Sequence, residues 1–237
     1  HSALVLRTRR SSFALGARPS HSALARRYYT GMANDAERKV YEQYQDEIAT
    51  KLAAGDNVGA FEAFDEMLNG DFYPYPTYYE NHTGLTNYFN FEQGNCGDCA
   101  IEYYSDWLET DEVRDAIHVG TLPYNDFNAS VEENLKLDWM RGVDDMLVPL
   151  LESDSVKVLI YSGQNDIILG PPATEKYLRG LEWSGKDVFA SAEKTVWSIE
   201  GSGTVQSKND PTAGYVTEVT DGSGGAYGFT YVAVRGA

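Results

Sequence analysis

The sequence lacks what several classes of protein require. Two cysteines among 237 residues are too few for a miniprotein built on disulfides or for a four-cysteine zinc site. No apolar run reaches the ~20 residues that a membrane-spanning helix needs. Basic residues are scarce, because 19 lysines and arginines against 36 aspartates and glutamates give a formal charge of −17. Such a surface repels phosphate backbones and anionic lipid, so we expect no nucleic-acid partner. The lack of a long apolar run in turn leads us to expect no membrane span.

Motifs for common cofactors and nucleophiles are also absent. The chain has no phosphate loop, no dinucleotide fingerprint and no His-Glu-x-x-His, so we expect no cofactor and no metal. The Gly-x-Ser-x-Gly elbow of a serine hydrolase does not occur either. His118, expected on a helix, and His82, inside a glycosylation triplet, are interpreted as structural residues. The residues in hand therefore do not make a complete hydrolase site.

Residues 1–34 contain no acidic residue, although they hold six arginines and repeat the tetrapeptide His-Ser-Ala-Leu. This composition resembles an organelle transit peptide, and cloning residue or mistranslated sequence would account for it equally well. We therefore leave residues 1–34 outside the fold, as an unassigned and disordered leader. Because the first residue is not Met, we expect a fragment or a processed product.

Helical patterns dominate the next part of the chain. Asn34 and Glu37 form a capping box before a stripe of apolar residues every four positions, which predicts a helix over 34–54. A second helix over 58–68, ending at Asn69-Gly70, would complete a helical hairpin. The aromatic segment 71–91 is predicted to be an ordered loop whose tyrosines pack on a core rather than stack on sugars. Thr110 is expected to cap one further helix, and Ser130 a long helix with a buried face from Val131 to Leu150.

The pattern then changes to strands. Residues 156–161 are nearly all apolar, which predicts a parallel strand covered on both faces. Residues 174–181 are predicted to be helical, and short strands are expected at 195–199, 214–219 and 229–234.

Asp166 is the candidate catalytic residue, because it follows the carboxyl end of the predicted buried strand. A carboxylate there can hold the ring N–H of a histidine and stabilise the imidazolium. From its position alone, Asp166 is also a suitable loop residue beside Asn165.

Two further features concern covalent modification. Asn81-His82-Thr83 and Asn128-Ala129-Ser130 are N-glycosylation acceptors, so Asn81 and Asn128 are candidate glycan sites on a secretory route. Cys96 and Cys99 form a C-x-x-C. A polar, glycine-containing loop precedes it, so a disulfide between Cys96 and Cys99, or pairing with cysteines elsewhere, is favoured over a redox motif.

An ordered series of motifs resembles the serine carboxypeptidases, in particular their vitellogenic-like and retinoid-inducible branch. The series runs in the family's order over roughly residues 36–237 and comprises residues 69–71, 88–91, 113–119, 157–168, 183–185, 194–197, 213–216 and 234–236.

The resemblance implies an α/β fold, specifically a partial α/β-hydrolase fold with a helical cap segment. Residues 35–155 would form the cap and adjoining helices, and residues 156–237 the carboxyl-terminal part of the sheet. Asp166 matches the acid of the family's catalytic triad, whereas the family's serine lies upstream and its histidine downstream of this chain. A match at that position favours the catalytic interpretation of Asp166 over the loop interpretation.

The implied function is removal of carboxyl-terminal residues from peptide or protein substrates, in a secreted or lysosomal/vacuolar setting. This chain alone is expected to be inactive. The alternative is a shortened, inactive homologue that acts as a binding protein.

Overall fold

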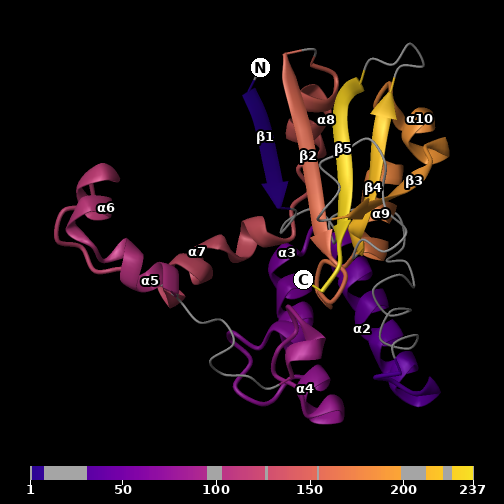
Figure 1. The fold of residues 1–237 in the computed structure, drawn as a ribbon. Coiled ribbons are helices and arrows are strands. Elements are labelled where there is room, and N and C mark those ends of the chain that lie inside the picture. The colour runs from indigo at the N-terminus through magenta and orange to yellow at the C-terminus, as the bar shows by residue number, and fades with distance from the viewer. Residues whose placement is uncertain are drawn as a thin grey trace.

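A five-stranded mixed sheet forms one half of the molecule (Figure 1). The computed structural model describes residues 2–7, 31–94, 103–125, 128–153, 155–198, 212–220 and 226–236. The strand order is β1-β2-β5-β4-β3, with β1, β2 and β5 parallel and β4 and β3 antiparallel to their neighbours. The strands are β1 (Ser2–Arg7), β2 (Val156–Gly163), β3 (Lys194–Ser198), β4 (Thr212–Thr220) and β5 (Ala226–Val234). The predicted strands near 156, 195, 214 and 229 are thereby confirmed.

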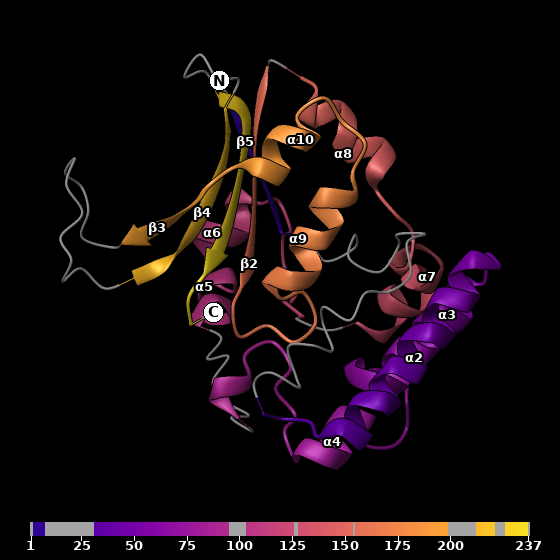
Figure 2. The ribbon, with the colours of Figure 1, turned by 90° about the vertical axis from the view of Figure 1, so that its right-hand side faces the viewer.

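Three helices cover one face of this sheet: α8 (Asp144–Leu151), α9 (Pro171–Gly180) and α10 (Lys186–Ser191) (Figure 2). Alternate residues of β2, among them Val158 and Ile160, point into the core beneath them. On the opposite face Lys157 is exposed, and the side chains of β2 on that face are not fully buried. The predicted covering of β2 on both faces is therefore wrong for the residues that the structure describes, although β2 does have a parallel neighbour on each side.

Strand β1 lies inside the segment that the sequence analysis left outside the fold. The structure instead pairs Ser2–Arg7 with β2, in register from Ser2 opposite Val156 to Arg7 opposite Tyr161. This run is Ser-Ala-Leu-Val-Leu-Arg, and its β-branched and apolar residues suit an edge strand. Composition concealed it, because the arginines and serines that follow dominate the segment.

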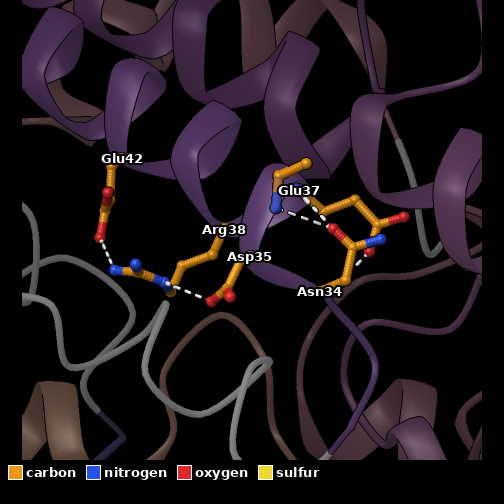
Figure 3. Close-up of polar contacts among 6 residues, drawn as sticks. Asn34, Asp35, Glu37, Arg38 and Glu42 are labelled. Atoms are coloured by element: carbon orange, nitrogen blue, oxygen red, sulfur yellow. Dashed lines mark hydrogen bonds and ion pairs between the residues drawn. The ribbon is translucent and has the colours of Figure 1, made fainter.

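The helical hairpin forms as predicted. Helix α2 (Asp35–Ala53) begins with a complete capping box, in which the Asn34 side chain accepts from the Ala36 and Glu37 amides and the Glu37 carboxylate accepts from the Asn34 amide (Figure 3). Its buried residues are Tyr41, Gln45 and Ile48, so the buried face follows the 3.6-residue helical period rather than the predicted four-residue stripe.

The second arm of the hairpin is α3 (Asn57–Phe64), which continues as a single π-helical turn, η1 (Asp65–Asn69). Gly70 ends the turn with a φ of 75°, a left-handed conformation that glycine adopts without strain.

The segment predicted as a loop over 71–91 contains a short helix, α4 (Tyr78–Thr83). Thr77 and Glu80 form a capping box, and Gly84 closes the helix in the left-handed region. The helix was missed because six residues carry too little periodicity to predict one. The tyrosines here mainly pack, since Tyr79 is fully buried and Tyr78 contacts the helical core, whereas Tyr75 is exposed.

The single long helix predicted after Ser130 is wrong, because the structure has two helices, α7 (Ala129–Trp139) and α8. Asn128 rather than Ser130 is the N-cap of α7, and its side chain accepts from the Ser130 and Val131 amides. The sequence Arg-Gly-Val at 141–143 interrupts the pattern, and glycine is a poor helix former. Val131 is exposed, so the predicted buried face does not extend to the start of α7.

The short elements η2 (Phe91–Gln93), α5 (Tyr103–Leu108) and α6 (Asp111–Ala116) complete the described fold. Helices α5 and α6 project away from the sheet in Figure 1. Thr110 occupies the N-cap position of α6 as predicted, although its side chain bonds to Trp107 instead of an α6 amide. Within the described residues, no helix combines the length with the apolar character that a membrane span requires.

Candidate functional site

Asp166 lies in the loop that directly follows β2 and is buried, with 7% of its surface exposed. Its Oδ1 atom accepts two backbone N–H groups, from Ile168 and from Leu169, each at 2.8 Å. These bonds turn the loop tightly around the carboxylate. A charged acceptor that receives two amides is held in one orientation, so the carboxylate is fixed relative to the sheet.

The carboxyl end of β5 lies beside this loop. Gly163 at the end of β2 pairs with Val234 at the end of β5, and the Gln164 amide donates to the Val234 carbonyl at 2.8 Å. Asp166 therefore follows one of two adjacent parallel strands that end at the same edge of the sheet. In open α/β sheets this edge is where functional residues gather.

A loop from the helical half closes over the same edge. The Ile167 amide donates to the Tyr88 carbonyl at 2.9 Å, and the Phe91 amide donates to the Asn165 carbonyl at 3.2 Å. From the same loop, Asn90 Nδ2 donates to the Gly236 carbonyl at 3.2 Å. The loop thus ties together the segment after β2 and the segment after β5.

Asp166 also stands between the two hydrophobic cores of the molecule. Ile167, Ile168 and Leu169 belong to the core of the helical half, whereas Val158 and Ile160, just before the loop, belong to the core under the sheet. The carboxylate is therefore buried at the junction of the two halves.

Asp166 lines a cavity of about 410 Å³. The cavity is also lined by Tyr88 and Ile168, by residues of α7 and by Asp71 in the loop after η1. The full lining consists of Asn69, Asp71, Tyr88, Phe89, Asn125, Asn128, Val131, Glu132, Leu135, Trp139, Asp166, Ile168 and Leu169. Its ionisable side chains are three carboxyl groups, so the cavity is acidic.

Two of these carboxyl groups, Glu132 and Asp71, interact electrostatically. Burial raises the pKa of Glu132 to about 7, and the hydrogen bond to Asp71 and the charges of Asp71 and Asp65 add to the increase, against the opposing effect of Lys136. Asp65 is almost completely buried and accepts the backbone N–H groups of Asp71, Phe72 and Tyr73, at 2.8, 3.0 and 2.6 Å. Asp65 thereby fixes the loop that carries Asp71.

The histidines within the described residues lie elsewhere. His82 is in α4, where its ring nitrogens contact the Tyr41 hydroxyl and the Tyr78 and Met32 carbonyls. His118 is exposed and follows α6 with a φ of 60°, outside the helix on which it was expected. Neither lines the cavity of Asp166. The buried Ser162 hydroxyl is bonded to the Tyr231 hydroxyl at 2.6 Å.

The other predicted sites are distributed as follows. Asn81 is exposed on α4, and Asn128 is exposed at the start of α7. The predicted pairing of Cys96 with Cys99 lies outside the described residues. Across the described part of the chain, no group of three His, Cys, Asp or Glu side chains could hold a metal ion.

Sequence reasoning missed Asp71, Glu132 and Asn90 as parts of this site. Asp71 and Asn90 fall within motifs that resemble the serine carboxypeptidases, which was the available signal. Glu132 gave none, because a glutamate in the first turn of a helix is ordinarily a solvated residue.

Comparison with known proteins identifies the family. The family model of serine carboxypeptidases, Peptidase_S10, matches residues 13–237. The chain belongs to the serine carboxypeptidase family. The match begins within the leader that the sequence analysis excluded, so the family resemblance extends further towards the amino terminus than predicted.

Individual relatives agree with this assignment. The chain is 34% identical over 209 residues to the probable serine carboxypeptidase CPVL of Homo sapiens, and the alignment covers 88% of this chain and 40% of that protein. It is 33% identical over 172 residues to the venom serine carboxypeptidase of Apis mellifera, in an alignment that covers 73% of this chain and 36% of that protein. The chain thus spans about 40% of the length of the curated relatives that it matches.

A solved structure supports the fold. The prohormone-processing carboxypeptidase Kex1Δp of Saccharomyces cerevisiae superposes with a TM-score of 0.64 at 16% identity, over 99% of this chain and 50% of that one. The serine carboxypeptidase chain described here therefore has part of an α/β-hydrolase fold, as predicted.

Proposed function

We propose that this chain is the carboxyl-terminal part of a serine-type carboxypeptidase in which Asp166 is the acid of the catalytic triad. The observation that carries the proposal is the position of Asp166, buried and rigidly held at the end of β2, beside the end of β5. In the family, the histidine follows the strand that β5 matches. Asp166 lies on the side of the sheet where such a histidine would arrive.

A second observation supports the same conclusion. Asn165 Nδ2, next to Asp166, is buried and has no hydrogen-bond partner in the described part of the chain. Buried donors are usually paired with protein or with ordered water. A further segment of the enzyme or a water molecule that accepts from Asn165 would satisfy the donor.

In the proposed enzyme a serine attacks the last peptide bond of the substrate while a histidine accepts its proton. The Asp166 carboxylate orients the histidine ring and stabilises the imidazolium. Backbone N–H groups hold the oxyanion that forms. Since Asp166 supplies one of the three triad groups, residues 1–237 alone should not hydrolyse peptides.

The proposed setting is secreted or lysosomal/vacuolar. The formal charge of −17 and the exposed Asn81 and Asn128 of two glycosylation acceptors support it. One of the relatives is named as a venom protein. Release of N-glycans by a glycosidase should lower the mass of the native protein, and an unchanged mass would contradict the secretory route.

Covalent labelling with a fluorophosphonate probe tests the function. The native protein, recovered from its source with an antibody against this chain, should bind the probe at one serine outside residues 1–237. The recombinant chain should not bind it. A native protein that stays unlabelled while folded would contradict the proposal and favour the shortened, non-enzymatic homologue.

A further inference from the structure

The loop of residues 87–91 binds the segment after β2 through its backbone. The Tyr88 carbonyl accepts from the Ile167 amide at 2.9 Å. The Phe91 amide donates to the Asn165 carbonyl at 3.2 Å. These two hydrogen bonds fall on the residues immediately before and after the proposed catalytic acid. The loop is therefore fixed relative to that carboxylate.

The side chain of Asn90, in the same loop, binds the segment after β5. Its Nδ2 atom donates to the Gly236 carbonyl at 3.2 Å. Gly236 lies two residues past Val234, the last residue of β5, and has a φ of 72°, which glycine adopts without strain. The hydrogen bond thus falls in the turn by which the chain leaves the strand.

A second contact fixes the orientation of the Asn90 side chain. Its Oδ1 atom accepts from the Glu92 backbone amide at 3.2 Å, as the N-cap of η2. Because Glu92 offers an N–H group and Gly236 offers a carbonyl, only one orientation of the Asn90 side-chain amide satisfies both. The cap of η2 therefore directs Nδ2 at Gly236.

The end of β5 is anchored on both sides before that turn. The Gln164 amide donates to the Val234 carbonyl at 2.8 Å, on the side of β2. The Arg235 amide donates to the Ala213 carbonyl at 2.8 Å, on the side of β4. Asn90 contributes its hydrogen bond one residue further along the chain, beyond the sheet.

We propose that Asn90 is a positioning residue, which sets the place of the triad histidine relative to Asp166 by holding the segment after β5. The inference rests on the proposed function, in which that histidine follows β5. One loop then fixes both members of the pair: its backbone holds the neighbours of Asp166, and one side chain holds the segment that leads to the histidine. Without Asn90, that segment could move while the sheet stayed intact.

A small displacement of the histidine is enough to slow the reaction. The carboxylate must hold the ring N–H while the imidazole accepts the serine proton, and a misplacement of about 1 Å can cost about 100-fold in rate. Within the described part of the chain, Asn90 is not among the residues that line the cavity of Asp166. Its loss should therefore lower kcat and leave KM nearly unchanged.

Kinetics of the full-length protein on a blocked dipeptide test the proposal. Asn90→Asp keeps the acceptor for the Glu92 amide and removes the donor to Gly236, so kcat should fall by about 10-fold to 100-fold. Asn87→Asp is the matched control, because it adds the same charge to the same loop and keeps the Oδ1 acceptor that Asn87 provides. Its kcat should remain close to that of the wild type.

A double-mutant cycle separates positioning from general damage to the fold. If Asn90 acts through the pairing of Asp166 with the histidine, Asn90→Asp should have little further effect on kcat in the Asp166→Asn background. The same fold-loss in both backgrounds would overturn the proposal. An unchanged kcat for Asn90→Asp in the wild-type background would overturn it as well.

Asn90→Ser covers the case in which Asn90→Asp folds poorly. Serine keeps an N-cap acceptor for η2, but its side chain is one atom shorter and does not reach Gly236. The same loss of kcat is expected at an unchanged unfolding midpoint, and a loss that follows a fall in the midpoint would show a purely structural role and overturn the proposal. Failure of the proposed function is distinguishable, because the wild-type protein itself would then not bind a fluorophosphonate.

Discussion

Asp65 shows how one buried side chain can organise the wall of a cavity. It accepts three successive backbone amides and so fixes the loop that presents Asp71 to the cavity. An asparagine at this position would turn its amide nitrogen or its single oxygen towards donors, so at least one N–H group would lose its acceptor. Hydrogen bonds to a charged acceptor contribute about 1.5–3 kcal/mol each.

We therefore expect Asp65→Asn to lower the free energy of unfolding by about 3 kcal/mol in urea denaturation. Asp46→Asn on the exposed side of α2 is the control, and should change it by no more than ~0.5 kcal/mol. If the two substitutions had the same small effect, the buried carboxylate would not be holding the loop.

At the residue scale, the sequence predicted the position of Asp166 but not its surroundings. A buried apolar strand followed by a polar loop is a local pattern, and it put Asp166 just after the strand, whereas the catalytic interpretation came from the family resemblance. Glu132 and Asp71 line the same cavity although they lie far apart in the sequence, and no local pattern records that they meet there. Asp65 was missed for a similar reason, because an acid within a helical pattern reads as exposed until another segment covers it.

At the scale of an element, the sequence predicted that a helix begins near residue 130 but not which residue caps α7. Asn128 and Ser130 are both good N-cap residues, so the sequence could not decide between them. The structure gives the role to Asn128, whose Oδ1 atom accepts from the Ser130 and Val131 amides. The two residues also belong to one glycosylation acceptor, which makes a matched pair of substitutions possible.

Asn128→Ala and Ser130→Ala both remove the acceptor triplet, but only the first removes the cap. In protein made without glycans, Asn128→Ala should therefore lower the free energy of unfolding by about 1 kcal/mol. Ser130→Ala should leave it nearly unchanged. Chemical denaturation measures both, and a larger loss in Ser130→Ala would place the cap at Ser130 after all.

Other elements were predicted correctly where the residues that determine them lie close together in the sequence, and were missed where those residues lie far apart. The capping box at Asn34 and Glu37 fixed the start of α2, because both partners lie within one turn. Strand β1 was missed because its pairing with β2 is set by a segment about 150 residues away in the sequence, and long-range pairing overrides composition.

At the scale of the whole molecule, the sheet and the helical half meet at the loop of Asp166. Val158 and Ile160, just before the loop, belong to the core under the sheet, whereas Ile167, within it, belongs to the core of the helical half. The cavity is lined from both halves, by Asp166 and Ile168 after β2 and by Glu132 of α7. A movement of α7 would therefore change the cavity that the proposed catalytic acid lines.

The central claim is that Asp166 has a chemical role in addition to its structural one. Asn at position 166 preserves the Oδ1 acceptor for the Ile168 and Leu169 amides, so Asp166→Asn should keep the loop and the unfolding midpoint. It removes the negative charge that would stabilise an imidazolium. The substitution thus separates the two roles.

The most direct measurement is kcat for release of the carboxyl-terminal residue from a blocked dipeptide, by the full-length protein that contains this chain. We predict that Asp166→Asn lowers kcat by about 10³–10⁴-fold while the unfolding midpoint stays the same. A variant that folds normally and keeps kcat within about tenfold of the wild type would contradict the assignment of Asp166 as the triad acid.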